Sequence, residues 1–269
     1  MRRTLTGWPA SVLRASLPGE PARLTALDAA IRAPLPLSTG VGVIGAGPDA
    51  PTALVGALVA GVLAARRPQW VLAVGASSAE RGIAWQAGLG SSAEGSDDAA
   101  TRRSAATSGS EATAGLARTP GGLFALELGD RPGQWWQAVA PITRFFDFVV
   151  TDWGTPDDPD DARAASAVLL VVVAARRPAL QAGVDLAHRL TTPHVAPLLV
   201  VHDTGAGTEH GLREAALVND AHWLPADRGL RSSRPADRRL RYATNRAVLE
   251  LSAAVVDRAV EHNLEAVIA

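Results

Sequence analysis

A strand–turn–helix–strand pattern in the first part of the chain restricts the possible folds more than any other feature. Residues 41–44 form a short apolar run, and a Gly-rich turn follows at residues 45–52. A helix built of small residues then covers residues 52–65, and a second apolar run occupies residues 71–74. Short apolar runs separated by a helix predict a βαβ unit with parallel strands. A parallel sheet is buried on both faces, so helices must cover it from both sides.

The same alternation continues towards the end of the chain. The predicted strands are residues 123–128, 145–152, 167–173, 197–201 and 221–224, and the predicted helices are residues 135–144, 178–190, 211–218 and 236–262, the last with a break near Tyr242. Alternating strands and helices predict the α/β fold class, as three layers around a doubly wound, mostly parallel sheet.

The composition changes along the chain and divides it into an N-terminal leader and a domain that contains one insert. Residues 1–38 are a Pro-rich N-terminal leader with one helical stretch at residues 21–33, and we expect this leader to lie against the domain. Residues 39–269 form the α/β domain. Within it, residues 88–118 are a Ser/Ala/Gly-rich insert with few large apolar side chains. Such a segment buries too little surface to offset the entropy of ordering, which predicts a mobile loop.

The overall composition excludes several classes of function. The 269 residues include no cysteine, which rules out disulfides and thiolate metal sites. The net charge is −1, so neither nucleic acid nor an anionic membrane is an expected partner. No apolar run is long enough to span a bilayer, and a cytoplasmic location is expected. All basic residues are arginine, so no mechanism can use a lysine of this chain.

The Gly-rich turn is the first candidate site. It carries Gly45, Gly47, Asp49 and Thr52 between a strand and a helix, where backbone N–H groups and the helix dipole favour an anion. Thr52 is a candidate magnesium ligand, in the place of the hydroxyl in a P-loop. The turn has no lysine, however, and Asp49 places a negative charge where a phosphate would lie. Its two prolines also remove two N–H donors. An ordinary tight turn is therefore the favoured interpretation.

Asp152 is the second candidate, because it ends the buried strand 145–152. A buried carboxylate is costly without a partner. Two interpretations remain open: Asp152 binds magnesium through water, or it caps the turn or accepts hydrogen bonds from the N–H groups of the Gly-rich loop. Three tryptophans, Trp135, Trp136 and Trp153, are candidates for a surface that binds a protein partner.

Several short motifs together resemble a known family. The motifs are Leu-Ala-Ala-Arg-Arg-Pro at residues 63–68, Val-Leu-Ala-Val at 71–74, Arg-Thr-Pro-Gly-Gly-Leu at 118–123, Phe-Phe-Asp-Phe-Val-Val-Thr-Asp-Trp-Gly at 145–154, and Leu-Pro-Ala-Asp at 224–227. They resemble MinD/ParA-like P-loop ATPases, which carry a deviant Walker A motif and belong to the SIMIBI class. The similarity is greatest to an actinobacterial branch associated with type VII secretion. It implies a P-loop NTPase-like fold, with Asp152 in the Walker B strand and Pro225 near the nucleotide base.

The departures from the family pattern fall at the residues that perform its chemistry. Both family lysines are missing, and Gly75 stands where the family has an acid after the second strand. Phosphoryl transfer depends on positioning and charge neutralisation, so useful turnover is not expected and no residue is assigned a catalytic role. The resulting hypothesis is a pseudo-ATPase that acts as a scaffold or regulatory partner in secretion or partitioning. It would bind an active paralogue or a secretion component, or form a homodimer, and would need no cofactor.

Two alternatives stay open. In the first, the chain is a weak ATP-binding ATPase that uses magnesium, with arginines in place of the lysines. In the second, it is an oxidoreductase that binds a flavin or nicotinamide dinucleotide, because residues 43–48 resemble the start of a Gly-x-Gly-x-x-Gly fingerprint. Ala50 replaces the third glycine of that fingerprint, and Gly75 stands where the ribose-binding acid would be.

Overall fold

A computed structural model describes residues 19–78, 81–90, 97–129, 132–192, 195–205, 209–231, 235 and 238–268. An eight-stranded sheet lies at the centre, in the order β3-β4-β2-β5-β1-β6-β7-β8. The strands are β1 (Thr39–Gly45), β2 (Val71–Gly75), β3 (Ala117–Arg118), β4 (Phe124–Glu127), β5 (Phe148–Gly154), β6 (Val168–Ala174), β7 (Leu198–His202) and β8 (His222–Leu224). All neighbouring pairs are parallel except β3 with β4. The predicted fold class is confirmed.

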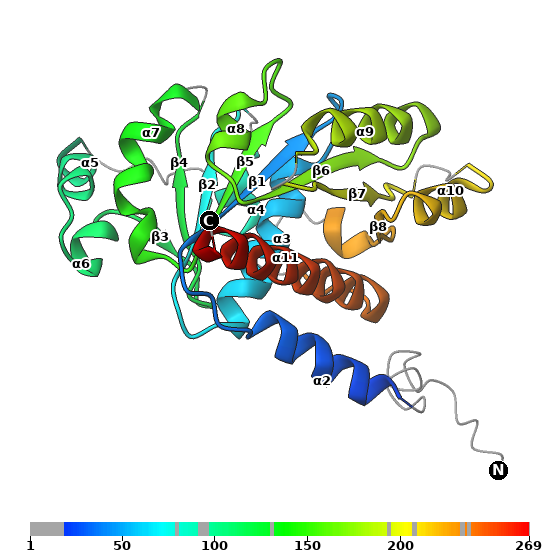
Figure 1. Cartoon of the computed structure of the whole chain (residues 1–269), viewed down its shortest axis with the longest axis horizontal. Coiled ribbons are helices and arrows are strands. Elements are labelled where there is room, and N and C mark those ends of the chain that lie inside the picture. The colour runs from blue at the N-terminus through cyan, green and yellow to red at the C-terminus, as the bar shows by residue number, and fades with distance from the viewer. Residues whose placement is uncertain are drawn as a thin grey trace, which may run out of the picture.

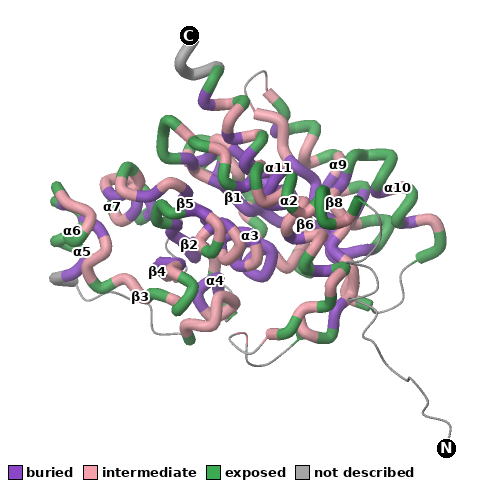
Figure 2. Tube along the Cα trace, turned by 90° about the horizontal axis from the view of Figure 1, so that it is seen from below, coloured by how far each residue is buried: buried purple, intermediate pink, exposed green. Residues whose placement is uncertain are grey.

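Helices cover both faces of this sheet (Figure 1). One face carries α2 (Glu20–Ile31), α3 (Thr52–Arg66), α4 (Ile83–Gln86) and α11 (Tyr242–Ile268); the other carries α7 (Trp135–Ala138), α8 (Asp160–Ala164), α9 (Arg177–Leu190) and α10 (Leu212–Val218). Alternate residues of each strand enter the two hydrophobic cores, as in β1, where Val43 faces α3 and Ile44 faces the opposite layer. The strands form the buried centre of the molecule (Figure 2).

Small residues let α3 approach its neighbours closely. A Cβ atom on Gly56 would lie 2.9 Å from Cδ1 of Ile83, so a side chain at this position would force Ile83 of α4 to shift. The predicted small-residue helix, α3, thus packs closely between the sheet and the outer helices.

Three predicted elements differ from the structure at their ends. The helix predicted at 135–144 is split into α7 and the 3₁₀ segment η2 (Ala140–Phe145), because Pro141 lacks an N–H and disfavours helical backbone in the residue before it. The strand predicted from residue 145 begins at Phe148. The last helix begins at Tyr242 instead of residue 236, and the N–H of Arg241 just before it donates to Asp227 at 2.7 Å.

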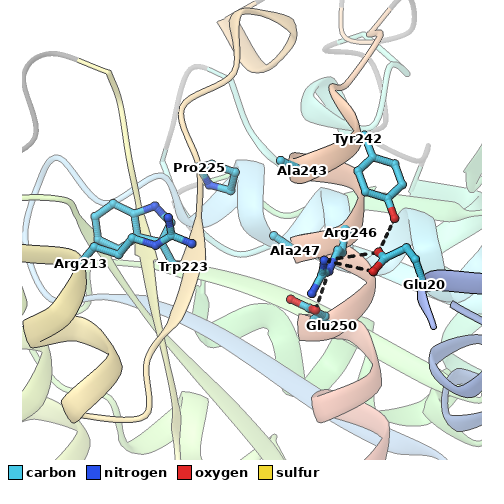
Figure 3. Close-up of a pocket in the computed structure, with 9 residues that line it drawn as sticks. All are labelled: Glu20, Arg213, Trp223, Pro225, Tyr242, Ala243, Arg246, Ala247 and Glu250. Atoms are coloured by element: carbon cyan, nitrogen blue, oxygen red, sulfur yellow. Dashed lines mark hydrogen bonds and ion pairs between the residues drawn. The ribbon is translucent and has the colours of Figure 1, made fainter. Parts of the chain in front are cut away.

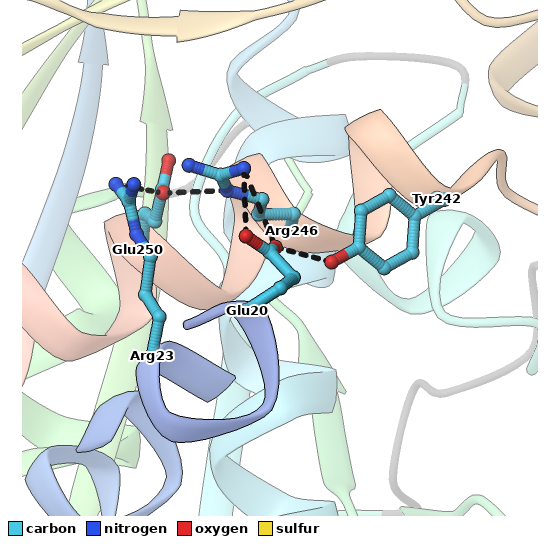
Figure 4. Close-up of polar contacts among 5 residues, drawn as sticks. All are labelled: Glu20, Arg23, Tyr242, Arg246 and Glu250. Atoms are coloured by element: carbon cyan, nitrogen blue, oxygen red, sulfur yellow. Dashed lines mark hydrogen bonds and ion pairs between the residues drawn. The ribbon is translucent and has the colours of Figure 1, made fainter. Parts of the chain in front are cut away.

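The N-terminal segment lies on the α/β domain through α2, whose described part packs against α11. The Glu20 carboxylate accepts from Tyr242 and pairs with Arg246, while Arg23 pairs with Glu250 at 2.7 Å (Figure 4). The leader's first 18 residues lie outside the described part of the chain.

The Ser/Ala/Gly-rich insert contains two short helices, α5 (Asp97–Ser104) and α6 (Gly109–Ala112). Ser108 and Glu111 form a capping box at the start of α6. Residues 91–96 lie outside the described residues, and the mobility of the insert stays a prediction.

One buried ion pair joins the leader to the sheet. The Arg67 guanidinium, whose side chain is 1% exposed, pairs with Asp147. It also donates to the carbonyl oxygens of Ile31 and, at 2.9 Å, of Ala33. It therefore links the end of α3, the end of α2 and the start of β5.

We predict that Arg67→Ala lowers the free energy of unfolding by about 3–5 kcal/mol, because it leaves the Asp147 carboxylate buried without its partner. The neighbouring Arg66→Ala is the matched control. Arg66 pairs with the partly exposed Asp28, and such pairs contribute about 0–1 kcal/mol. The stability of both variants is measured by urea unfolding. An equal loss in the two would contradict the view that Arg67 forms the stabilising buried ion pair.

Candidate functional site

The Gly-rich loop follows β1, a central strand that lies between β5 and β6 in the sheet. A Cβ on Gly45 would lie 2.7 Å from both the Ala50 methyl carbon and Thr155 Oγ1, so the loop folds closely over the strand end. The Thr155 hydroxyl donates to the carbonyl of Gly47 at 3.1 Å. The structure thus brings the loop into contact with the segment that follows β5.

Most backbone donors of this loop are already used within the protein. Residues 46–52 have five N–H groups, because two of the seven residues are prolines. Three of the five donate to backbone carbonyls: Ala46 to Val172 at 3.1 Å, Ala50 to Gly47 at 3.1 Å, and Thr52 to Ala50 at 2.9 Å. A phosphate cradle needs several N–H groups pointing at the ligand. In this loop, only the N–H groups of Gly47 and Asp49 take no part in these three bonds.

The two polar side chains of the loop face different partners. The Asp49 carboxylate forms an exposed ion pair with Arg176, at 2.9 Å. Thr52 begins α3, is buried, and its hydroxyl lies near the carboxylate of Asp152. The loop therefore carries a negative side chain at its tip and a hydroxyl turned inwards to the end of β5.

Asp152 is fully buried at the end of β5. Its Oδ2 accepts from the Ser77 hydroxyl at 3.0 Å, and its Oδ1 accepts from the N–H of Gly154 at 3.0 Å. Burial raises the pKa of Asp152, and the Thr52 hydroxyl and these two donors offset part of the shift. The geometry matches the interpretation in which Asp152 caps the turn, with the donors coming from the loops after β2 and β5.

Glu127 is a second acid at this edge. Glu127 on β4 lies opposite Gly75 on β2 in the strand register. Gly75 also lies opposite Asp152 on β5, the other neighbour of β2. A Cβ on Gly75 would lie 1.6 Å from Glu127 Oε2, so the carboxylate fills the space above the end of β2. Its Oε1 accepts from the N–H of Ala84 at 2.7 Å. Burial raises the pKa of Glu127, and the charge of Asp152 raises it further.

Residues 75–78, at and after the end of β2, contain no acid. A carboxylate, that of Glu127, reaches the end of this strand from β4. The strand predicted at 123–128 did include Glu127, but the register that sets it beside Gly75 depends on tertiary pairing.

Pro225 lies apart from the other predicted site residues. It lines a cavity of about 460 Å³ between α2, α10, β8 and α11. Glu20, Tyr242 and Arg246 also border the cavity, whose lining includes none of Gly45, Gly47, Asp49, Thr52 and Asp152 (Figure 3).

The three candidate tryptophans divide by burial. Trp135 and Trp153 belong to the core, and Trp136 is 42% exposed. The His202 ring, at the end of β7, is buried, and both its nitrogens lack a partner among the described residues. Burial lowers the pKa of His202, which favours its neutral form. In the part of the chain that the structure describes, no helix is long and apolar enough to cross a membrane, and no three acidic, His or Cys side chains form a metal-binding group.

The central parallel sheet with a Gly-rich loop after β1 defines the P-loop NTPase architecture. Solved structures place it more narrowly. The ParA family ATPase of Chlorobium tepidum matches with a TM-score of 0.63 at 13% identity, over 80% of this chain and 98% of that one. MinD of Pyrococcus horikoshii, solved with Mg-ADP, gives 0.60 at 13% identity, over 80% and 94%. MinD of Pyrococcus furiosus gives 0.58 at 16% identity, over 82% and 99%.

The chain therefore has the fold of ParA/MinD P-loop ATPases. Identities this low show the fold alone. No family model matches the sequence, and no curated protein matches it. The structural matches favour this fold over the dinucleotide-binding alternative.

We predict that Gly75→Ala lowers the free energy of unfolding by about 1–3 kcal/mol, because the new methyl group collides with the Glu127 carboxylate. The double variant with Glu127→Ala should recover much of that loss. A double-mutant cycle in urea measures the coupling. Additive effects of the two substitutions would show that the carboxylate does not lie over Gly75.

The raised pKa values of Asp152 and Glu127 also predict a pH dependence. Above their ordinary values of 3.8 and 4.5, the folded state holds more protons than the unfolded chain. The contribution of both groups to the free energy of unfolding therefore falls as the pH rises through this range. Glu127→Gln should lessen the fall, measured by urea unfolding at pH values from about 4 to about 8.

Glu111→Gln is the control for this pH series. Hydrogen bonds from Thr107 and Ser108 lower the pKa of Glu111, so its contribution to stability has the opposite sign. Its substitution should not lessen the fall. An equal effect of the two glutamines would contradict the assignment to Glu127.

Proposed function

We propose that this protein is a ParA/MinD-like scaffold that binds a protein partner without turning over ATP. The observation that carries the proposal is the closed loop after β1. Three of its five N–H groups donate to backbone carbonyls, and no lysine of the chain can neutralise a phosphate. Phosphoryl transfer gains nearly all of its rate from positioning and charge neutralisation, and the loop supplies little of either.

The charges around the loop support the same conclusion. The carboxylates of Glu127 and Asp152 lie at the ends of β4 and β5, on either side of β2, and Asp49 extends from the loop itself. Among the described residues, the cation paired with the loop is Arg176, and its partner there is Asp49. A polyphosphate would meet net repulsion here unless a cation came from elsewhere.

A second candidate function is weak nucleotide binding with magnesium. The retained Thr52–Asp152 arrangement favours it, since these are the two oxygen-bearing side chains that the family uses near the metal. Arg176 is the arginine placed to act in lieu of a lysine, because it contacts the loop, whereas Arg66 and Arg67 lie at the far end of α3. In this version Arg176 must leave Asp49 when the nucleotide binds.

The cellular setting is part of the proposal. We expect the protein in the cytoplasm, in secretion or partitioning, bound to an active paralogue, to a secretion component or to a second copy of itself. The type VII secretion-associated branch remains the family assignment that its sequence motifs favour.

Isothermal titration of the full chain with ATP and ADP, each with and without magnesium, tests the proposal. We expect no heat of binding at millimolar nucleotide, because three of the loop's five N–H groups are already used and the chain has no lysine. Asp49→Ala, which removes the repulsive carboxylate and frees Arg176, is the informative variant: weak binding gained in it would support the account of the loop. Micromolar, magnesium-dependent binding by the natural chain that is lost in Asp152→Ala would establish the second candidate instead.

A further inference from the structure

A groove lies along the outer side of α3, on the face of the sheet that carries α4 and α11. Its volume is about 680 Å³, and its sides come from α4, the turn between β3 and β4, and the segment that leads into α11. We call it the α3 groove; its lining includes Leu58, Gly61, Val62, Arg238, Arg239 and Leu240. The lining contains no residue of the Gly-rich loop, so the groove is a separate site.

The floor of the α3 groove is apolar and partly open to solvent. Leu58 and Val62 are four residues apart on α3, so they lie on one face of the helix. Both are half-buried, and Leu240 is half-buried on the opposite side of the groove. A ligand with apolar side chains would remove this remaining surface from water, which favours binding.

Gly61 leaves open space above this floor. A Cβ atom on Gly61 would meet no atom of the described residues within 4 Å, whereas one on Gly56 would meet Ile83. Glycine in the interior of a helix lowers its stability, because the unfolded chain is more flexible there. Internal packing accounts for Gly56 but not for Gly61. The missing side chain at Gly61 instead keeps the groove open.

The rim of the α3 groove carries positive charge that the described residues do not neutralise. Arg239 is exposed and has no partner among them. Arg238 donates to the backbone carbonyl of Gln86 at 2.9 Å and to the side-chain oxygen of the same residue, which are both neutral groups. A third arginine, Arg66, pairs with Asp28. No described residue of the lining is acidic, so the charges of Arg238 and Arg239 stay uncompensated there.

The sequence next to the groove adds to this charge. Residues 228–241 include six arginines and a single acid, Asp237. Arginines of this density attract either nucleic acid or an acidic protein. Interfaces with nucleic acid are highly polar, whereas the floor of this groove is built from aliphatic side chains. The apolar floor therefore favours a protein.

We propose that the α3 groove binds an acidic segment of a protein partner. Apolar side chains of that segment cover Leu58 and Val62, and its carboxylates pair with Arg239 and Arg238 on the rim. Guanidinium groups bind carboxylates through paired hydrogen bonds, which adds geometric selectivity to the attraction. The inference rests on the proposed scaffold role and deepens it by giving the chemistry of the partner. It makes no use of nucleotide.

The first test is a selection from a phage-displayed library of random peptides, with the full chain as bait and no nucleotide present. Phage that bind the variant Gly61→Leu are removed beforehand, so that the selection reports on the groove. We expect the enriched peptides to combine Asp or Glu with Leu, Ile, Phe or Trp. Enrichment of peptides without acidic residues, or no enrichment at all, would overturn the proposal.

The most enriched peptide is then made with a fluorescent label and titrated by anisotropy. Gly61→Leu should weaken its binding at least about tenfold, because the new side chain fills the groove. The melting temperature of this variant should not fall, since leucine forms helix better than glycine. The matched control is Gly133→Leu, at a position where a Cβ also has open space but outside the groove. Equal weakening by the two leucines would count against the α3 groove.

Charge is tested with Arg239→Gln, which should weaken binding about threefold or more and reduce its dependence on salt. Arg189→Gln removes the same charge from an exposed position of α9 outside the groove and should have little effect. If both variants weakened binding equally, the attraction would be a property of the whole surface and not of this rim.

Two further measurements separate the other possible occupants. A labelled DNA duplex replaces the peptide in the same titration, and sedimentation compares the mass of the natural chain with that of Gly61→Leu. We expect neither DNA binding nor self-association that this variant abolishes; either result would overturn the proposal. Because nucleotide is absent throughout, failure here leaves the result of the nucleotide titration standing, and the reverse also holds.

Discussion

The carboxylate of Asp152 is buried at the end of β5, where it connects segments that are far apart in the sequence. Ser77 reaches it from the loop after β2, Gly154 from the loop after β5, and Thr52 from the start of α3. A buried carboxylate is stable only with such partners, so this one group fixes how the three loops lie on the sheet. Through Thr52, the end of the Gly-rich loop is part of that arrangement.

The charge pattern at this edge of the sheet suits a cation better than a phosphate. Glu127 adds a second carboxylate beside Asp152, and the loop after β1 adds Asp49. The chain has the ParA/MinD fold, contains no lysine, and uses three of the five N–H groups of the loop after β1 in bonds to its own carbonyls.

Much of the fold could be predicted from the sequence, because parallel strands are buried on both faces and therefore read as short apolar runs between helices. The pattern of β1, α3 and β2 is the clearest case. The features that escaped prediction depend on contacts between distant residues. The register between β2 and β4 places Glu127 over Gly75. The N–H groups of the Gly-rich loop donate to acceptors that include the distant Val172 carbonyl. The sequence left two interpretations of Asp152 open, a turn cap or a magnesium ligand, because a sequence does not show which groups donate to a carboxylate.

The central claim is that the loop after β1 is closed upon itself, and amide hydrogen exchange measures this most directly. Backbone amides that donate to protein carbonyls exchange slowly, and a bound phosphate protects amides that are otherwise free. The account predicts that the amides of Ala46, Ala50 and Thr52 exchange slowly in the free protein, and that millimolar Mg-ATP leaves their rates unchanged. Fast exchange at all three positions, slowed by Mg-ATP, would show an open phosphate cradle and contradict the account.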